Sequence, residues 1–258
     1  VEGGLKGMLG GSGRLPSLQA LSARDTIRGR SVSSLAALIC AGKVPSLKEA
    51  RLRLTKSELN EIQVLAMSLF TPDAASMRQM EVQFSFPLSD PHASAKVATF
   101  CVALTSKHLA KLEVLQVSEI QDRSGVVSLC AGLGSGKLAS LRDLTLEQVS
   151  LESEAEALSK ALNAEKLPSL RVLKIVNSSL TDEGLKVLTD AWTSQPPPPL
   201  WNLDLGVNRL TEGGVDTLAD ILASKRLHSL SNLNLRRNGI GDRGKAVLTR
   251  VFPEFVAF

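Results

Sequence analysis

Residues 200–229 read LWNLDLGVNRLTEGGVDTLADILASKRLHS, and residues 230–252 begin the same pattern again as LSNLNLRRNGIGDRGKAVLTRVF. Asparagine and glycine recur in step between the two segments, as at Asn208 and Asn238 and at Gly214 and Gly244. A chain that repeats itself at a fixed period of this size forms stacked structural units and not a single globule. These two segments therefore predict a solenoid.

The same unit continues backwards through most of the chain. Each unit opens with an apolar residue, and the openers are Leu18, Leu47, Met77, Leu112, Leu141, Leu170, Leu200 and Leu230. Apolar residues follow three and five positions later, mostly with polar residues between them, which predicts one short strand buried on one side. Further along each unit, apolar residues recur at offsets of 3, 4 and 7, which predicts an α-helix with one apolar stripe. Thr181 and Thr211, each followed by acidic residues, are typical of helix starts.

One strand and one helix cannot bury their apolar sides alone, but stacked copies can. We therefore expect an α/β solenoid with a parallel β-sheet on the concave face and α-helices on the convex face. The expected domain is a single one over residues 1–258, with a partial unit at 1–17 and repeats that start at 18, 47, 77, 112, 141, 170, 200 and 230. The last residues, VFPEFVAF, lack a polar cap, so we expect a fragment of a longer protein. The alternative is a cap formed by Phe252, Phe255 and Phe258.

The pattern LxxLxLxxNxLTxxG, seen at residues 200–214 and again at 230–244 with Ile240 and Gly241 substituted, resembles the leucine-rich repeat. The unit length and the full helix resemble the ribonuclease-inhibitor-like class of that family. In the family, the asparagine of this pattern bonds the backbone at the turn. Ile120 and Val149 occupy that position in two units and cannot do so, which predicts irregular turns there.

The composition limits the class of protein. The 43% hydrophobic content suits a packed core, and a net charge of +4 with no cluster in the sequence gives no reason to expect nucleic acid as a partner. The three cysteines form no CxxC or Cys/His motif, so neither a metal site, a cofactor nor a disulfide framework is expected. Reduced thiols and the lack of a signal-like segment favour an intracellular, cytoplasmic protein. No apolar run is long enough to cross a membrane, so no membrane is expected as a partner.

Three segments depart from the simple repeat. The unit opened by Met77 carries five extra residues within 84–92, which form either a binding loop or a segment whose Phe86 and Leu88 complete the core. Residues 196–199 are four prolines, which form either a rigid connector or a polyproline segment that docks on a partner. Residues 132–137, GLGSGK, do not match a phosphate-binding loop because Ala131 and Leu138 occupy two of its required positions.

The side chains two, four and six positions after each opener should lie on the concave side of the sheet. They vary from unit to unit while the buried positions stay apolar, with a basic front near Arg24, Arg51 and Arg53 and an acidic middle at Asp143 and Glu147. Trp201 stands out in a polar position beside the first strand residue, where it could anchor a partner. The candidate protein-binding residues are Arg24, Arg51, Arg53, Glu81, Gln116, Asp143, Glu147, Lys174, Trp201, Asp204, Asn234 and Arg236. The alternative is a uniformly solvated face.

These observations favour a non-catalytic protein–protein interaction scaffold that binds a protein partner on its concave face. The family resemblance implies two alternatives, a regulator of a small GTPase of the leucine-rich-repeat GTPase-activating kind and a ligand-sensing repeat domain of an innate immune receptor. A hydrolase is disfavoured, because His92, His108 and His228 fall in different units and form no catalytic spacing with serine or acid residues.

Overall fold

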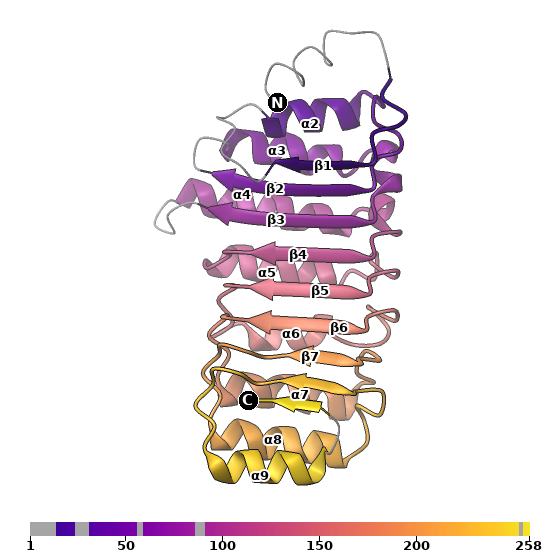
Figure 1. The fold of residues 1–258 in the computed structure, drawn as a ribbon. Coiled ribbons are helices and arrows are strands. Elements are labelled where there is room, and N and C mark those ends of the chain that lie inside the picture. Colours follow the sequence, from indigo (N-terminus) through magenta and orange to yellow (C-terminus); the bar gives the residue numbers. More distant parts are fainter. Residues whose placement is uncertain (1–13, 24–30, 56–58, 86–90, 253–254) are drawn as a thin grey trace.

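The computed structural model describes residues 14–23, 31–55, 59–85, 91–252 and 255–258, which form one parallel sheet backed by a row of helices (Figure 1). In the described part of the chain, the strands are hydrogen-bonded in chain order. They are β1 (Ala20–Ala23), β2 (Glu49–Thr55), β3 (Gln79–Ser85), β4 (Val114–Ser118), β5 (Asp143–Glu147), β6 (Val172–Val176), β7 (Asn202–Asp204), β8 (Asn232–Asn234) and β9 (Phe255–Ala257). The sheet lines the concave face of an α/β leucine-rich-repeat solenoid.

The helices lie on the opposite, convex face and follow the strands in alternation. They are α2 (Ser31–Cys40), α3 (Leu59–Ser68), α4 (Pro91–Val102), α5 (Arg123–Leu133), α6 (Ala155–Ala161), α7 (Asp182–Ser194), α8 (Glu212–Ala223) and α9 (Asp242–Val251). Short 3₁₀ turns η2 (Pro72–Ser76), η3 (Ala103–Thr105) and η4 (Lys107–Leu109) lie between α3 and β4.

The strands have the predicted phase, because each of β1 to β8 begins two residues after an opener. In β3 the side chains of Met80, Val82 and Phe84 are buried, whereas those between them are half-buried on the other side of the sheet. Leu203 of β7 and Leu218 of α8 are each 1% exposed, so the strand and helix stripes face the same core. The predicted arrangement of alternating strands and helices is therefore confirmed.

The core is built mainly from leucine, with one large exception in α7. Trp192 occupies the position where most other helices carry leucine or isoleucine, and it is 1% exposed. Its indole Nε1 donates a hydrogen bond of 2.7 Å to the carbonyl oxygen of Leu162 in the preceding repeat. This bond satisfies the one polar group of a buried tryptophan and ties α7 to the repeat before it.

The turn after each strand follows one backbone path in the later repeats. The residue seven positions after the opener has a positive φ in five successive repeats, at Glu119, Gln148, Asn177, Val207 and Arg237. This left-handed step occurs before Ile120 and Val149 as well as before Asn208 and Asn238. The prediction of irregular turns at Ile120 and Val149 is therefore wrong. The apolar side chains are buried there, and hydrogen bonds from the neighbouring repeat, such as Ser178 Oγ accepting from Val149 N, hold the backbone path.

Asn208 is the best-connected residue of these turns. Its Oδ1 accepts from the backbone N–H groups of Ser178 and Leu180 at 3.0 and 3.1 Å. Its Nδ2 donates to the carbonyl oxygens of Ile175, Leu205 and Gly206 at 2.6, 3.0 and 3.3 Å. Since these partners belong to two adjacent repeats, the asparagine joins the repeats as well as closing its own turn.

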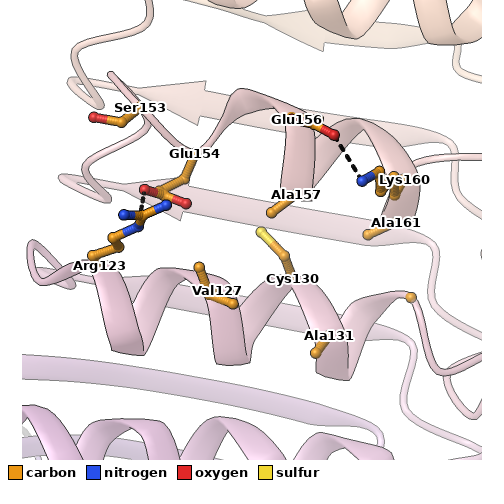
Figure 2. Close-up of a pocket in the computed structure, with 11 residues that line it drawn as sticks. Arg123, Val127, Cys130, Ala131, Ser153, Glu154, Glu156, Ala157, Lys160 and Ala161 are labelled. Carbon is orange, nitrogen blue, oxygen red and sulfur yellow. Dashed lines mark hydrogen bonds and ion pairs between the residues drawn. The ribbon is translucent and has the colours of Figure 1, made fainter.

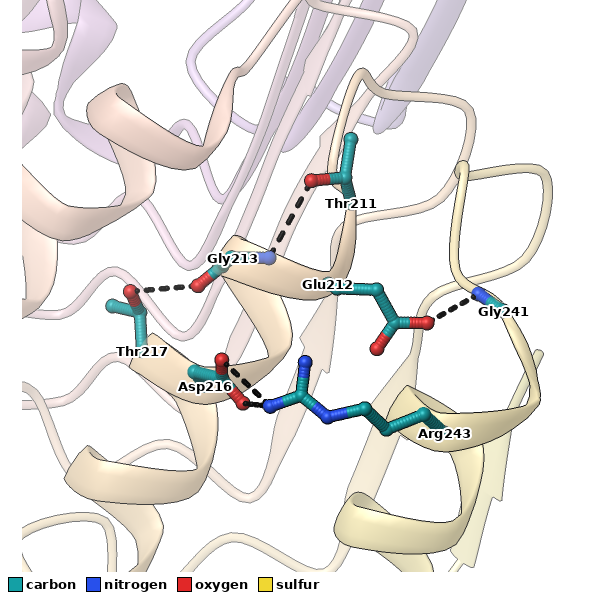
Figure 3. A network of polar contacts seen from close by, with 7 residues as sticks. All are labelled: Thr211, Glu212, Gly213, Asp216, Thr217, Gly241 and Arg243. Carbon is teal, nitrogen blue, oxygen red and sulfur yellow. Dashed lines mark hydrogen bonds and ion pairs between the residues drawn. The ribbon is translucent and has the colours of Figure 1, made fainter.

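Polar contacts at the helix starts join the last repeats (Figure 3). The hydroxyl oxygens of Thr181 and Thr211 accept from Gly184 N at 3.2 Å and Gly213 N at 3.4 Å, which confirms both predicted helix caps. Glu212, in the first turn of α8, accepts from Gly241 N of the next repeat at 3.0 Å. A Cβ atom added to Gly244 would lie 2.7 Å from Glu212 Oε2 and 2.9 Å from Ile240 Cγ2. A larger residue at this position would therefore displace the Glu212 carboxylate or the Ile240 side chain.

The three irregular segments have different outcomes. Residues 86–90 of the long unit lie outside the described residues, so both interpretations of Phe86 and Leu88 stay predictions; the preceding Phe84 is buried edge-on against Phe100, with ring centroids 5.6 Å apart. The proline run packs as a connector, because Pro198 is buried and the carbonyl oxygen of Pro196 accepts from Ala164 N at 2.9 Å. Residues 134–137 form the link from α5 to the next strand.

The residues after α9 form a strand that the repeat pattern did not predict. β9 pairs in parallel with β8, with Phe255 opposite Asn232. Phe252 is 5% exposed and packs on the core, whereas Phe258 is 36% exposed.

Candidate protein-binding face

The middle row of the concave face runs straight across the sheet. Side chains four positions after the openers are in register from strand to strand, and those from β2 to β8 are half-buried, whereas Ser22 on β1 is exposed. The row is Arg51, Glu81, Gln116, Thr145, Lys174, Asp204 and Asn234. Neighbouring strands are about 4.8 Å apart, so the row is roughly 30 Å long and mixes both charges.

The front of this face is less basic than the sequence predicted. The guanidinium of Arg51 lies 3.7 Å from Glu49 Oε2 and 3.9 Å from Glu81 Oε2. These two carboxylates come from its own strand and the next, which the sequence-based interpretation did not bring together. The basic front at Arg51 is therefore largely neutralised, and Arg24 lies outside the described residues.

Arg53 belongs to a chain of polar contacts along the strand ends. Its Nε donates to Ser85 Oγ at 3.0 Å, and Ser85 Oγ in turn donates to Glu119 Oε2 at 3.2 Å. Gln83 Nε2 donates to the other oxygen of Glu119 at 2.7 Å. Gln83 lies on the concave face as the repeat predicts, but its bond to Glu119 was not predicted, because Glu119 lies in a turn and its partners are more than thirty residues away.

Two other candidates are engaged in their own turns. Asp204 Oδ1 accepts from Gly206 N at 2.9 Å, and Asn234 Oδ1 accepts from Arg236 N at 3.1 Å. Such side-chain bonds to a backbone two residues ahead are typical of aspartate and asparagine at turns. Asp204 and Asn234 therefore have a structural function in addition to any contact with a partner.

The centre of the face lies on β5 and β6. Asp143 and Lys174 are half-buried and Glu147 is exposed, and among the described residues none of the three forms an ion pair. Asp143 and Glu147 are four residues apart on one strand, so their Cα atoms are separated by about 13 Å. This is longer than the roughly 5–9.5 Å that separates the paired carboxylates of glycoside hydrolases. The arrangement suits recognition of complementary charges better than acid–base chemistry.

Trp201 lies at the edge of the sheet and not in its rows. It precedes β7, is 48% exposed, and its backbone N–H donates to Arg171 O at 2.8 Å. Gln116 is half-buried on β4, and Arg236 is exposed beyond the end of β8. The predicted site residues thus follow the length of the face, with Trp201 on its border.

The helix face contains a separate hollow of ≈ 420 Å³ between α5 and α6 (Figure 2). It exists because α6 spans seven residues, whereas α5 and α7 span 11 and 13. Ion pairs stand at its two ends, Arg123–Glu154 at 2.9 Å and Glu156–Lys160 at 2.8 Å. Each charged group is therefore paired with a neighbour at its own end of the hollow. Val127, Ala131, Ala157 and Ala161 are the apolar side chains that line it.

Cys130, which lines this hollow, and Cys101 on α4 are buried thiols with low reactivity. Burial raises the pKa of the Cys130 thiol to about 12, and burial raises the pKa of Cys101 as well. Both are free thiols in the position that most other helices fill with a small residue. Cys40 is exposed.

Within the described ranges, no cluster of three or more histidine, cysteine, aspartate or glutamate side chains is arranged to hold a metal ion. None of the helices in those ranges has the length and apolarity needed to cross a bilayer.

Together, the stacked strand–helix units define a leucine-rich-repeat solenoid. Its fold is similar to that of a protein from Bacteroides fragilis, with a TM-score of 0.51 and 15% identity over 82% of this chain and 65% of that one. An internalin from Listeria monocytogenes matches with a TM-score of 0.39 and 15% identity over 93% of this chain and 58% of that one. A leucine-rich-repeat protein from Leptospira interrogans matches with a TM-score of 0.33 and 13% identity, over 88% and 68% of the two chains.

These likenesses concern the fold alone, and the chain spans less than two thirds of the first two proteins. No protein-family model and no curated protein sequence matches this chain.

Proposed function

We propose that this protein is an interaction scaffold that binds a protein partner on the concave face, centred on β5 and β6. The observation that carries the proposal is the contrast between the two sides of one sheet. The buried side is apolar in every repeat, whereas the open side changes between acidic, basic and neutral residues along its length. Stability alone requires the first property but not the second.

The size of the face supports the same function. A row of roughly 30 Å, several side chains wide, matches the surface of about 800 Å² per partner that a stable protein complex uses. Its mixed charges favour a protein surface with a matching pattern, since a phosphate backbone would favour one sign throughout. The full helices, up to 13 residues long in α7, support the resemblance to the ribonuclease-inhibitor-like class.

The central contacts are Asp143, Glu147 and Lys174. They stand on two adjacent strands, with Asp143 opposite Val172 and Glu147 opposite Val176 in the sheet register. Because none of them has an ion-pair partner among the described residues, a partner would not need to break existing salt bridges to reach them. Val172 and Val176 flank Lys174 on β6 and add apolar surface at the centre.

The test is affinity capture with two charge-swapped variants. The sheet-face variant carries Glu147→Lys and Lys174→Glu, and the helix-face variant carries Lys186→Glu and Asp190→Lys. Neither variant changes the net charge, and the helix-face swap preserves the ion pair in reverse order. A partner captured by the wild type should be lost by the sheet-face variant and kept by the helix-face variant. Equal capture by all three proteins would exclude this face.

A further inference from the structure

One edge of the solenoid, where the strands begin, gathers basic residues that are far apart in the sequence. The residue directly after each opener is joined to its neighbours by backbone hydrogen bonds, from Arg78 N to Lys48 O at 2.8 Å through to Trp201 N to Arg171 O at 2.8 Å. The row is Gln19, Lys48, Arg78, Glu113, Arg142, Arg171, Trp201 and Ser231. Neighbours in this row are about 4.8 Å apart.

A second set of cations lies on the same edge, in the links from the helices to the strands. Lys107, Lys111 and Lys137 are exposed, and Lys166 is half-buried. A Cβ atom built on Gly136 would lie 3.9 Å from Cδ of Lys166, so the Lys166 side chain passes close to Gly136. Gly136 directly precedes Lys137 in the chain. The links therefore place a second line of lysines beside the first row. We call the six residues Lys107, Lys111, Lys137, Arg142, Lys166 and Arg171 the basic edge.

The basic edge is not neutralised by acids of the protein. Acidic residues also lie at the strand starts: Glu49 and Asp143 directly follow Lys48 and Arg142, and Glu113 lies 3.8 Å from Arg78, which is outside the basic edge. Within the described residues, no member of the basic edge has a carboxylate oxygen within 4.0 Å. Arg171 Nη1 donates to the carbonyl oxygens of Pro168 and Leu170 at 3.3 and 3.2 Å, which holds its side chain at this edge without neutralising its charge.

Exposed apolar side chains lie on the same side of the molecule. Trp201 is 48% exposed in the row; Phe70, two residues after α3, is 47% exposed, and Val102, the last residue of α4, is 48% exposed. Tryptophan together with basic residues is typical of surfaces that rest at a membrane–water interface. The cations follow the outer edge of the sheet, with Trp201 as the one exposed aromatic residue in their row, whereas single-stranded nucleic acid prefers a basic groove in which several aromatic side chains stack on the bases.

We propose that the basic edge binds the surface of membranes that contain anionic lipids, with Trp201 entering the interfacial region. The basic edge adjoins the concave face, because Arg142 and Arg171 directly precede β5 and β6, but it shares none of the central contacts Asp143, Glu147 and Lys174. Binding would be peripheral and electrostatic. It would weaken as the Debye length falls from about 10 Å at 0.1 M salt to about 3 Å at 1 M salt.

The experiment is co-sedimentation of the protein with vesicles of phosphatidylcholine, alone or with about one third phosphatidylserine. We expect binding to the anionic vesicles only. The double variant Lys137→Gln with Arg142→Gln should lower the partition coefficient by about 30-fold, because each basic residue at an anionic surface contributes about fivefold. The control Lys186→Gln with Arg237→Gln removes the same charge from the helix face and the opposite edge, and it should change the coefficient less than twofold.

Tryptophan fluorescence gives a second readout. Trp192 is buried and hydrogen-bonded, so a blue shift on adding anionic vesicles would report Trp201, and Trp201→Phe should abolish it. The proposal is overturned by equal binding to neutral vesicles, by an equal loss in both double variants, or by the absence of binding. Tighter binding to a single-stranded oligonucleotide than to the vesicles would also overturn it. Partner capture by the concave face should be unchanged in Lys137→Gln with Arg142→Gln, so the two proposals fail separately.

Discussion

Asn208→Ala should be among the most destabilising single changes on the turn side of the solenoid. The substitution removes two hydrogen bonds accepted by Oδ1 and the contacts that the two N–H groups of Nδ2 make with three carbonyl oxygens, at a residue that is 9% exposed. The backbone N–H groups of Ser178 and Leu180 would lose their acceptor in a buried position. An unsatisfied buried donor costs about 1–3 kcal/mol, so the two together predict a loss of roughly 3 kcal/mol.

The equivalent change one repeat later should cost less. Asn238 makes three such bonds and is half-buried, so Asn238→Ala is expected to cost about 1–2 kcal/mol. Asn232→Ala is the control, because this half-buried residue on β8 has no side-chain hydrogen bond among the described residues. Its effect should stay within about 0.5 kcal/mol.

Urea unfolding followed by circular dichroism measures the three free energies. Because each repeat contacts mainly its neighbours, the loss can also appear as local opening of the last repeats. Hydrogen exchange resolves that case, and protection of the Ser178 and Leu180 amides should fall by about 100-fold in Asn208→Ala. The reasoning is refuted if Asn208→Ala and Asn232→Ala have the same unfolding free energy and the same exchange rates at those amides.

Three further predictions concern strain, a buried bond and the thiols. Val207→Asn should stabilise the protein by about 1 kcal/mol, since a β-branched residue is strained at φ 57° and asparagine tolerates a left-handed backbone. Trp192→Phe should destabilise it by about 1–3 kcal/mol, because the carbonyl of the preceding repeat loses its buried donor. In native protein at neutral pH only Cys40 should react with a thiol reagent, since the raised pKa of the two buried cysteines keeps them protonated.

A control variant or a contradicting result tests each of these three predictions. Asn177→Val, which places valine at φ 51°, should destabilise the protein by an amount similar to the gain in Val207→Asn, and thermal unfolding measures both. A neutral effect of Trp192→Phe would show that the indole bond contributes little. More than one reactive thiol per native chain would contradict the burial of Cys101 and Cys130, and denatured protein should give all three.

The sequence predicted the repeat because burial imposes a strict spacing. Leu203 and Leu218 must be apolar for strand and helix to share a core, and such positions recur at the same interval in every unit. Residue type did not predict the turns before Ile120 and Val149, which keep the regular backbone path without the asparagine. There the neighbouring repeats hold the backbone, so the local residue type does not decide its path.

Features that depend on contacts between repeats were not visible in the sequence. Glu81 neutralises Arg51 only because their strands are adjacent, although the two residues are thirty positions apart. The basic edge is hidden in the same way, because its lysines and arginines are spread over several repeats and the net charge of the whole chain is only +4. Stacking the repeats converts this dispersed composition into a one-sided surface.

Binding of a protein partner on the concave face is the central function proposed for this solenoid. The decisive measurement is the dissociation constant of a captured partner for the wild type, for Glu147→Lys with Lys174→Glu, and for Lys186→Glu with Asp190→Lys. We predict that the sheet-face swap weakens binding by about tenfold or more, equivalent to about 1.4 kcal/mol, and that the helix-face swap leaves it unchanged. A helix-face swap that weakens binding as much as the sheet-face swap would contradict the account.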